Sequence, residues 1–377
     1  MTITVSSDFC GGNIICKKAD KASNIRLNIR KDEASDFYQW FYFRLTGTKG
    51  QACRMVIENA GDAAYPKGWD GYQAVISYDL HDWQRVASTK YDGKALTIEL
   101  TPEHDSVYVA YFAPYTLQRH AELIAGAQMN SAARVSVLGQ TLDGRDLDLI
   151  TIGEPGEGKK QFWFTARQHP GETMAEWWME GFLNRLLDPA DPVAKWLLER
   201  VVFHVVPNMN PDGSTRGHLR TNAAGVNLNR EWAEPSMKKS PEVFLTLQRM
   251  DETGVDFALD VHGDEALPYN FIAGCEGVPN FTDGLRTLIT RFKDEYVAAN
   301  ADFQTKYGYP ENKPGNANLS ICGNAISHRF DCASMTLEMP FKDNADRPDA
   351  AHGWSPARSK RLGADVLDAL VGVFELI

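Results

Sequence analysis

The sequence has little cysteine for its length and no Cys-x-x-Cys pair. Its 377 residues include six cysteines, which are Cys10, Cys16, Cys53, Cys275, Cys322 and Cys332. This usage excludes a disulfide-rich secreted scaffold and a zinc site built from cysteines, so free thiols in a reducing cytoplasm are expected. The first eight residues also lack the basic start and apolar run of a secretory signal, and we expect a cytoplasmic protein.

The chain also lacks an excess of positive charge. It holds 39 Lys and Arg residues against 50 Asp and Glu residues, a formal net charge of -11. Partners such as nucleic acid or an anionic membrane surface would call for a basic excess, so neither is expected. The sequence contains no apolar run of about 18 residues that could span a bilayer. Its hydrophobic content of 43 % still allows a large core, and its length predicts two domains.

Residues 1–125 are predicted to form a β-rich N-terminal domain. Short β-branched and aromatic runs, among them 35–46, 51–58, 95–100 and 106–112, follow one another with turn residues between them. Short, regularly spaced strands of this kind are typical of an antiparallel sandwich. Because no cluster of histidines or carboxylates occurs there, we interpret this domain as a structural or docking module.

Residues 126–377 are predicted to form an α/β catalytic domain. Strand-like segments alternate here with helical ones: strands are expected at 147–152, 161–166, 201–206, 257–261 and 334–337, and helices at 173–187 and 241–250. This alternation predicts a mixed, mostly parallel sheet flanked by helices. The predicted fold class is therefore α/β, preceded by a smaller antiparallel β-sandwich.

Histidines and carboxylates directly follow several of these predicted strands. They are His169, Glu172, His262 and Glu338. Ligands of an open α/β sheet bind beyond the carboxyl ends of its strands. Hydrolytic zinc usually takes three His or carboxylate ligands and keeps one position open, so His169, Glu172 and His262 are candidate ligands. Glu338 is then the candidate group that moves protons of the attacking water.

The spacing of these residues is weak support by itself. The pattern His-x-x-Glu occurs twice, at His169/Glu172 and at His262/Glu265, and the chain has nine histidines. A satisfied histidine at a strand end and a capping carboxylate are the structural alternatives for His262 and Glu338. The convergence of the residues on one sheet edge is what favours a metal site.

The most specific stretch of the chain runs over residues 209–232. It contains the motifs Asn-Pro-Asp-Gly and Asn-Leu-Asn-Arg, downstream of His169-Pro-Gly-Glu172. In this order the motifs resemble the zinc metallocarboxypeptidase family, and most closely its cytosolic carboxypeptidase-like branch. The resemblance covers the chain from about residue 130 to the C-terminus. The aromatic runs 37–44 and 109–115 are similar to the β-rich companion domain of that branch.

The resemblance implies a role for seven positions of this sequence. One zinc ion per chain would be bound by His169, Glu172 and His262. The catalytic residues would be Glu338 and Arg220, of which Arg220 polarises the scissile carbonyl and holds the oxyanion. The free C-terminal carboxylate of the substrate would be bound by Asn229 and Arg230. A guanidinium pairs with a carboxylate through two parallel hydrogen bonds, which suits this last task.

The sequence departs from the family pattern at Asn227. Much of the family has an aspartate there, two residues before the Asn-Arg pair, that orients a zinc-bound histidine. An amide accepts the same hydrogen bond without adding negative charge, which predicts weaker zinc binding unless Asp260 or Asp264 substitutes.

A second open position is the tyrosine that covers the substrate in the family. Tyr307, Tyr309 and Tyr269 are its candidates in this sequence.

The branch is associated with removal of acidic C-terminal residues, notably glutamate. Such specificity needs a cation in the substrate pocket, and Arg329, nine residues before Glu338, is the candidate for substrate binding. His328 is a second candidate, and a structural role for Arg329 beside Asp331 is the alternative. Residues 126–377 carry nearly all of the net negative charge, which disfavours a polyanionic substrate unless the cleft is locally basic.

Three functions are consistent with these residues. The first is a zinc metallocarboxypeptidase acting on the C-termini of peptides or proteins, and the intact motif block favours it. The second is a zinc amidohydrolase that acts on a small N-acyl amino acid. The third is a module that binds C-termini without cutting them, against which the retained Glu338 argues. Because no long pro-segment precedes the predicted catalytic part, no zymogen step is expected.

Overall fold

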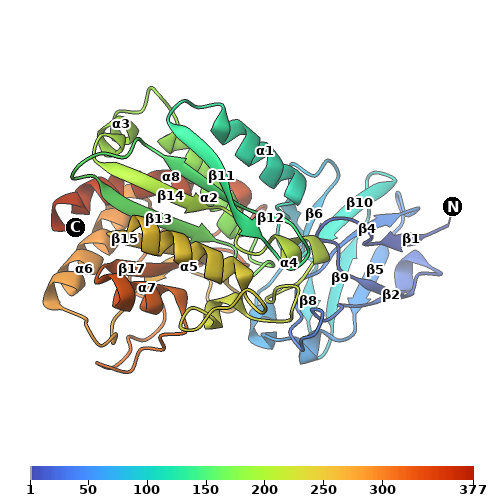
Figure 1. Cartoon of the computed structure of the whole chain (residues 1–377). Helices are drawn as coiled ribbons and strands as arrows, with labels where there is room; N and C mark the ends of the chain where they lie inside the picture. Colours follow the sequence, from blue (N-terminus) through green and yellow to red (C-terminus); the bar gives the residue numbers. More distant parts are fainter. Residues whose placement is uncertain (1) are drawn as a thin grey trace.

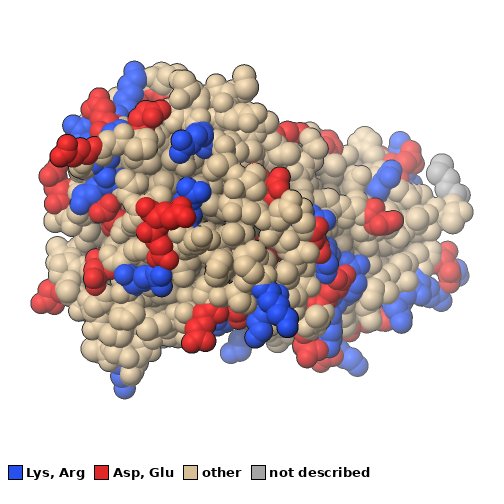
Figure 2. Space-filling model, in the orientation of Figure 1, with Lys and Arg blue, Asp and Glu red and all other residues tan. Residues whose placement is uncertain are grey.

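A computed structural model of the chain describes residues 2–377 and shows two units side by side (Figure 1). The N-terminal unit, blue to cyan, holds two five-stranded sheets, and the larger unit holds a seven-stranded sheet between helices. The predicted α/β fold with a smaller β domain in front of it is confirmed. Among the described residues, no helix is long and apolar enough to cross a membrane. On the face drawn in Figure 2, acidic and basic side chains are interspersed over both units.

The two sheets of the N-terminal unit have the strand orders β1-β4-β10-β6-β7 and β2-β3-β5-β9-β8. Their pairs are antiparallel except for β3 with β5, which is parallel. The strands are β1 (Thr4–Ser6), β2 (Ile15–Lys18), β3 (Ile25–Asn28), β4 (Tyr42–Thr46), β5 (Cys53–Ile57), β6 (Val75–Ser77), β7 (Gln84–Arg85), β8 (Lys90–Tyr91), β9 (Leu96–Leu100) and β10 (Ser106–Ala110). Single turns of 3-10 helix are η1 (Ala22–Asn24), η2 (Ala60–Asp62) and η3 (Pro66–Trp69).

The aromatic run 35–46 forms a strand only over its last five residues, as β4. Residues 38–41 before it are irregular but buried, and Phe41 packs against Trp69 and Tyr111. Gln39 replaces a strand ladder there, because its side-chain amide accepts from the Tyr65 N–H and donates to the Tyr65 carbonyl, at 2.8 and 3.1 Å. Aromatic content marks packing against a core rather than extended backbone, which is why the predicted strand was too long.

The larger unit has the strand order β11-β12-β14-β13-β15-β17-β16. The four neighbours β14, β13, β15 and β17 are parallel, and the remaining pairs are antiparallel. The strands are β11 (Ala133–Gln140), β12 (Asp146–Ile152), β13 (Lys160–Ala166), β14 (Val201–Val206), β15 (Phe257–Asp264), β16 (Phe271–Ala273) and β17 (Ala333–Pro340). Parallel pairing is therefore confined to the centre of the mixed sheet.

Helices cover both faces of this sheet (Figure 1). They are α1 (Leu117–Gln128), α2 (Met174–Leu186), α3 (Pro192–Leu198), α4 (Pro211–Arg216), α5 (Pro241–Thr253), α6 (Asp283–Ala299), α7 (Cys322–Phe330) and α8 (Pro356–Val373), with the short turns η4 (Leu228–Arg230) and η5 (Phe374–Leu376). Successive side chains of a strand point to opposite faces. Phe162 and Phe164 accordingly join the core under α2 and α8, and Trp163 joins the core under α5 and α7.

Two central strands are longer than predicted, and this changes the placement of the candidate site residues. β15 continues to Asp264 and β17 to Pro340, so His262 and Glu338 lie within strands instead of after them. The two residues are register partners in the parallel pair of β15 and β17. Both strands are flanked by other strands, and continued pairing explains why they extend past the apolar runs.

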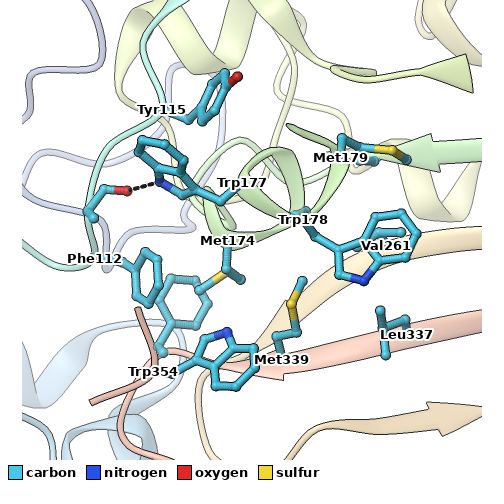
Figure 3. Close-up of a cluster of buried hydrophobic side chains, with 14 of the residues drawn as sticks. Phe112, Tyr115, Met174, Trp177, Trp178, Met179, Val261, Leu337, Met339 and Trp354 are labelled. Atoms are coloured by element: carbon cyan, nitrogen blue, oxygen red, sulfur yellow. Dashed lines mark hydrogen bonds between the residues drawn. The ribbon is translucent and has the colours of Figure 1, made fainter. Parts of the chain in front are cut away.

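The junction of the two units is packed with large apolar side chains (Figure 3). Trp177 of α2 donates from its indole nitrogen to the carbonyl of Ala113 at 3.0 Å, and its ring packs edge-on against Tyr115 at 4.7 Å. The boundary predicted between residues 125 and 126 falls inside α1, and α1 packs on β11 and β12. We therefore propose that the boundary lies ahead of Leu117.

A buried ionic network holds α1 to α2. His120 of α1 contacts Glu176 at 2.6 Å and Asp148 at 3.2 Å, and Arg167 donates to the other oxygen of Glu176 at 2.6 Å. Burial alone would lower the pKa of His120, but the two carboxylates outweigh it and raise the pKa to about 9. The network reaches the loop that begins at Arg167 and follows β13.

We predict that His120→Gln destabilises the protein most at low pH. Because the pKa of His120 is higher in the folded chain than in the unfolded chain, its contribution is complete below about pH 6.5 and is lost as the pH rises through about 9. The difference in free energy of unfolding between wild type and variant should shrink by about 3 kcal/mol from pH 6 to pH 10. Urea unfolding at several pH values measures it, with His104→Gln on the surface as the control. A difference that stays constant with pH would contradict this assignment.

Candidate active site

One loop and one strand bring the three candidate ligands together. His169 and Glu172 lie in residues 167–173, between β13 and α2 (the metal loop), and His262 lies in β15. The Glu172 carboxylate bridges the histidines, with 2.7 Å from Oε1 to His169 Nδ1 and 2.8 Å from Oε2 to His262 Nδ1. All three side chains are buried. In residues 2–377 this is the one group of at least three His, Cys, Asp or Glu side chains close enough to hold a metal ion.

The donor set fits zinc. Two imidazole nitrogens and one carboxylate are a typical set for a hydrolytic zinc ion. The other nitrogen of each ring is also bonded, from His262 Nε2 to Asp260 at 2.6 Å and from His169 Nε2 to Asn227 at 3.0 Å. Such outer partners fix the orientation of a ligand ring and tune its basicity.

The partners of the two histidines answer the question raised by Asn227. Asp260 is the hydrogen-bond partner of His262, and it also accepts hydrogen bonds from Thr165 and Gln168. It therefore does not replace the missing aspartate at His169. Asp264 instead accepts from the Tyr309 hydroxyl at 2.5 Å. His169 therefore has a neutral amide as its outer partner, and His262 has a carboxylate.

Burial and neighbouring charges shift the pKa values of the three candidate ligands. Burial lowers the pKa of His169 to about 4, and nearby Arg220 acts in the same direction. Burial opposes ionisation of Glu172, but the two histidines hold its pKa well below the usual range. For His262 burial is outweighed by Asp260 and Glu172, which raise its pKa, so metal binding must release a proton there.

Glu338 lies next to this group on β17. It is 7 % exposed, and its Oε2 has no hydrogen-bond partner among the described residues. Burial raises the pKa of Glu338 well above its usual range, while His262 opposes the shift. A buried carboxyl group with a free oxygen is suited to accept a proton from water and to pass it on.

Arg220 comes from residues 217–222, which follow α4 (the arginine loop). Its Nη1 is 4.0 Å from Glu172 Oε1, and its Nε has no partner within residues 2–377. The metal loop touches this loop through Gly171, whose N–H donates to the Leu219 carbonyl at 2.9 Å. A Cβ at position 171 would lie 2.9 Å from the same oxygen, which explains glycine in the His-Pro-Gly-Glu motif.

A pocket of about 290 Å³ brings Arg220 together with the two residues expected to bind the terminal carboxylate. It is lined by Arg220, Asn229, Arg230 and Tyr309, among others. Asn229 Oδ1 accepts from the Cys322 N–H at 2.8 Å, which fixes the amide. Of the three candidate tyrosines, Tyr309 lines the pocket.

The other two tyrosine candidates lie outside the residues that line this pocket. Tyr307 and Tyr269 stack on each other, with ring centroids 4.3 Å apart. Tyr309 is therefore the tyrosine whose position suits a covering role.

The structure places Arg329 away from this pocket. Its guanidinium on α7 pairs bidentately with Asp251 of α5, at 2.7 and 2.8 Å, and its side chain is 51 % exposed. His328 likewise bonds to Asn280. Neither residue lines the pocket, and Arg329 pairs with Asp251 instead of Asp331, the neighbour named in the alternative above.

The charged groups that do line the pocket include Glu276 and Lys293, with Lys293 Nζ 3.8 Å from Glu276 Oε1. Sequence reasoning missed both, because they lie after β16 and in α6, outside every motif.

Glu265, which repeats the His-x-x-Glu spacing, is buried but does not belong to the metal-binding group.

Comparisons with known proteins agree with this geometry. The family described as cytosolic carboxypeptidase N-terminal domain matches residues 5–112, and the family described as zinc carboxypeptidase matches residues 120–344. An uncharacterized protein of Zymomonas mobilis is 51 % identical over 375 residues, with 100 % of this chain and 97 % of that one covered. Cytosolic carboxypeptidase 3 of Mus musculus is 30 % identical over 73 % of this chain, which spans 30 % of that relative's length.

Solved structures resemble the whole chain. A metallo-carboxypeptidase from Burkholderia cenocepacia has a TM-score of 0.97 at 49 % identity, with 99 % of this chain and 100 % of that one covered. A metallo-carboxypeptidase from Pseudomonas aeruginosa has a TM-score of 0.96 at 46 % identity, with the same coverage. The latter was solved in complex with (2-guanidinoethylmercapto)succinic acid.

We predict that Asn227→Asp strengthens zinc binding. A carboxylate at this position would add negative charge behind His169 and raise the basicity of its ring, while keeping the oxygen that also accepts the Asn229 N–H. The Kd for zinc should fall by about tenfold, the scale of changes among outer partners of ligands. Competition with a chelator measures it on metal-free protein. Asn316→Asp adds the same charge at an exposed position and should leave Kd unchanged, whereas equal affinity of wild type and Asn227→Asp would contradict the prediction.

Proposed function

The chain belongs to the zinc carboxypeptidase family and is a metallocarboxypeptidase, and from this premise we propose that it removes single residues from the C-termini of peptides or proteins. The observation that carries the proposal is the convergence of a zinc-type ligand set, a buried free carboxyl group and a pocket with two arginines. One zinc ion per chain is part of the proposal. The cytoplasm is its proposed place of action, supported by six cysteines that are all free.

The proposed mechanism has three parts, which are binding of the terminal carboxylate, binding of the zinc ion, and proton transfer with stabilisation of the developing charge. Asn229 and Arg230 bind the terminal carboxylate, with Tyr309 closing the pocket. Zinc, when bound by the His169, Glu172 and His262 set, supplies Lewis acidity toward water and the scissile carbonyl.

Glu338 transfers the proton, and Arg220 stabilises the negative charge that develops on the substrate. Glu338 takes a proton from the attacking water and delivers it to the amine that leaves. Arg220 donates hydrogen bonds to the carbonyl oxygen as negative charge develops there, an effect on the order of several kcal/mol. The free Nε of Arg220 and the free Oε2 of Glu338 support these assignments.

We predict that Glu338→Gln abolishes cleavage without removing the metal. Zinc-loaded wild type should release one residue from short peptides, and the variant should be slower by about 10²–10⁴-fold, because the amide cannot accept the proton. Amino-acid release is followed by mass spectrometry, with zinc content measured on both proteins. Glu234→Gln, on the surface, serves as the control.

Two results would overturn the proposed function in favour of its alternatives. Zinc-loaded protein that hydrolyses N-acyl amino acids but no peptide would be a small-molecule amidohydrolase. Protein that binds C-terminal peptides but cleaves neither substrate would be a binding module.

For the substrate side chain, we propose a preference for a basic C-terminal residue. Removal of glutamate, the expectation from the cytosolic branch, would need a fixed cation, and Arg329 does not line the pocket. The Glu276 side chain is 7 % exposed and lies close to Gly274, whereas the Lys293 side chain is 21 % exposed and is the more accessible partner of the pair. An incoming Lys or Arg side chain can therefore take the place of Lys293 beside Glu276. The ligand of the Pseudomonas aeruginosa relative contains a guanidino group, which supports the same preference for a basic C-terminal residue.

Glu276→Gln is predicted to lower kcat/KM for peptides ending in Arg or Lys by about 10–100-fold, because a charged hydrogen-bond partner is lost. Peptides ending in Leu should change little. Lys293→Ala is the matched variant, and it should keep or raise activity on basic ends. If wild type instead prefers peptides ending in Glu and Lys293→Ala removes that preference, the pocket selects acidic residues through Lys293.

A further inference from the structure

Asp32 belongs to the N-terminal unit, but its carboxylate lies at the backbone of the arginine loop. The residue is 2 % exposed and sits between β3 and β4. Its oxygens accept from three consecutive N–H groups, those of Leu219 at 2.6 Å, Arg220 at 2.8 Å and Thr221 at 2.9 Å, and from the Thr221 hydroxyl at 3.1 Å. Within residues 2–377 no Lys, Arg or His forms an ion pair with Asp32. The buried charge is therefore held by the loop backbone.

The same unit also contacts the first two residues of the arginine loop. At its start, the Asn13 side chain donates to the Gly217 carbonyl at 2.8 Å. Gly217 has a φ of 69°, and a Cβ there would lie 2.5 Å from the Gly12 carbonyl oxygen, so the two backbones are in close contact. At the next residue, the Glu33 N–H donates to His218 Nε2 at 3.1 Å, and His218 Nδ1 then donates within the loop to the Thr221 carbonyl at 3.0 Å.

The side chain of Arg220 is held by the N-terminal unit as well. Its guanidinium carbon lies 5.3 Å from the ring centroid of Tyr65 and 5.7 Å from that of Phe37. Phe37 is also linked to Asp32, because the Asp32 N–H donates to the Phe37 carbonyl at 2.8 Å. A cation over aromatic faces is attracted to them and is restricted in direction.

We propose that Asp32 is a positioning residue that fixes Arg220 for its part in catalysis, which makes the N-terminal unit a component of the active site. The inference rests on the proposed function of Arg220. A hydrogen-bond donor to a developing oxyanion is effective only when its position is set before the reaction. Asp32 sets the backbone of Arg220, and Phe37 and Tyr65 set the direction of its side chain. The docking module expected from the sequence would thus also shape the catalytic centre.

The first test is hydrogen exchange of the amides at positions 219–221, compared among wild type, Asp32→Ala and Asp36→Ala. Asp36 is the matched control, because its side chain is 96 % exposed and bonds only to Lys31. We expect the three amides to exchange at least about tenfold faster in Asp32→Ala and to be unchanged in Asp36→Ala. Unchanged exchange in Asp32→Ala would overturn the proposal, and this readout needs no peptidase activity.

The second test is a double-mutant cycle with Arg220→Ala in the full chain, using zinc-loaded protein. Asp32→Ala should lower kcat by about tenfold or more with a smaller change in KM, and it should add little in the Arg220→Ala background. Independent, additive losses would overturn the positioning role. If Asp32→Ala does not fold, Asp32→Asn and Thr221→Val replace it, since each keeps most of the contacts and should give a smaller loss of the same kind. Wild type without peptidase activity would defeat the proposed function, while the exchange result would still decide whether Asp32 holds the loop.

Discussion

The bridging of two histidines by Glu172 is the interaction on which the site depends. The carboxylate joins the metal loop to β15, and the Gly263 N–H donates to it as well, at 3.1 Å. A buried carboxylate is stable only with such partners, so the loop must close onto the central strand in this arrangement. Parallel pairing of β15 and β17 then sets Glu338 beside His262. One buried charge and one strand register thus define the catalytic geometry that we propose.

The second constraint is the seam between the two units. Apolar packing around Trp177 and the hydrogen bonds of the Asp32 carboxylate hold the two units together at two separate places. A small β domain that only increased stability would not need a buried carboxylate, that of Asp32, bonded to the backbone of the loop that contains Arg220. The division of the chain into a catalytic unit and an accessory unit is therefore structural rather than functional.

Much of the fold and part of the site could be predicted from the sequence, and the rest depended on long-range contacts. Alternating strands and helices, the candidate ligand residues and a contact of Asn227 with one of the two histidines follow from local patterns and motif order, while the hydrogen-bond geometry in the fold is needed to show that this histidine is His169. The extension of β15 and β17 through His262 and Glu338 does not, because polar residues at strand ends hide the continued pairing. Glu276 and Asp32 were also out of reach, since each acquires its role from a partner distant in the chain. Arg329 was misplaced because proximity to Glu338 in sequence says nothing about the face of α7.

We infer that His169, Glu172 and His262 form a zinc site beside Glu338, and X-ray absorption at the zinc edge of the loaded protein is the measurement to make first. We expect one zinc per chain with a coordination shell of nitrogen and oxygen at about 2.0–2.2 Å and no sulfur. We also expect this signal to be lost in His262→Ala. A sulfur-containing shell, or a zinc signal that survives the loss of His262, would show that zinc is not bound at these residues.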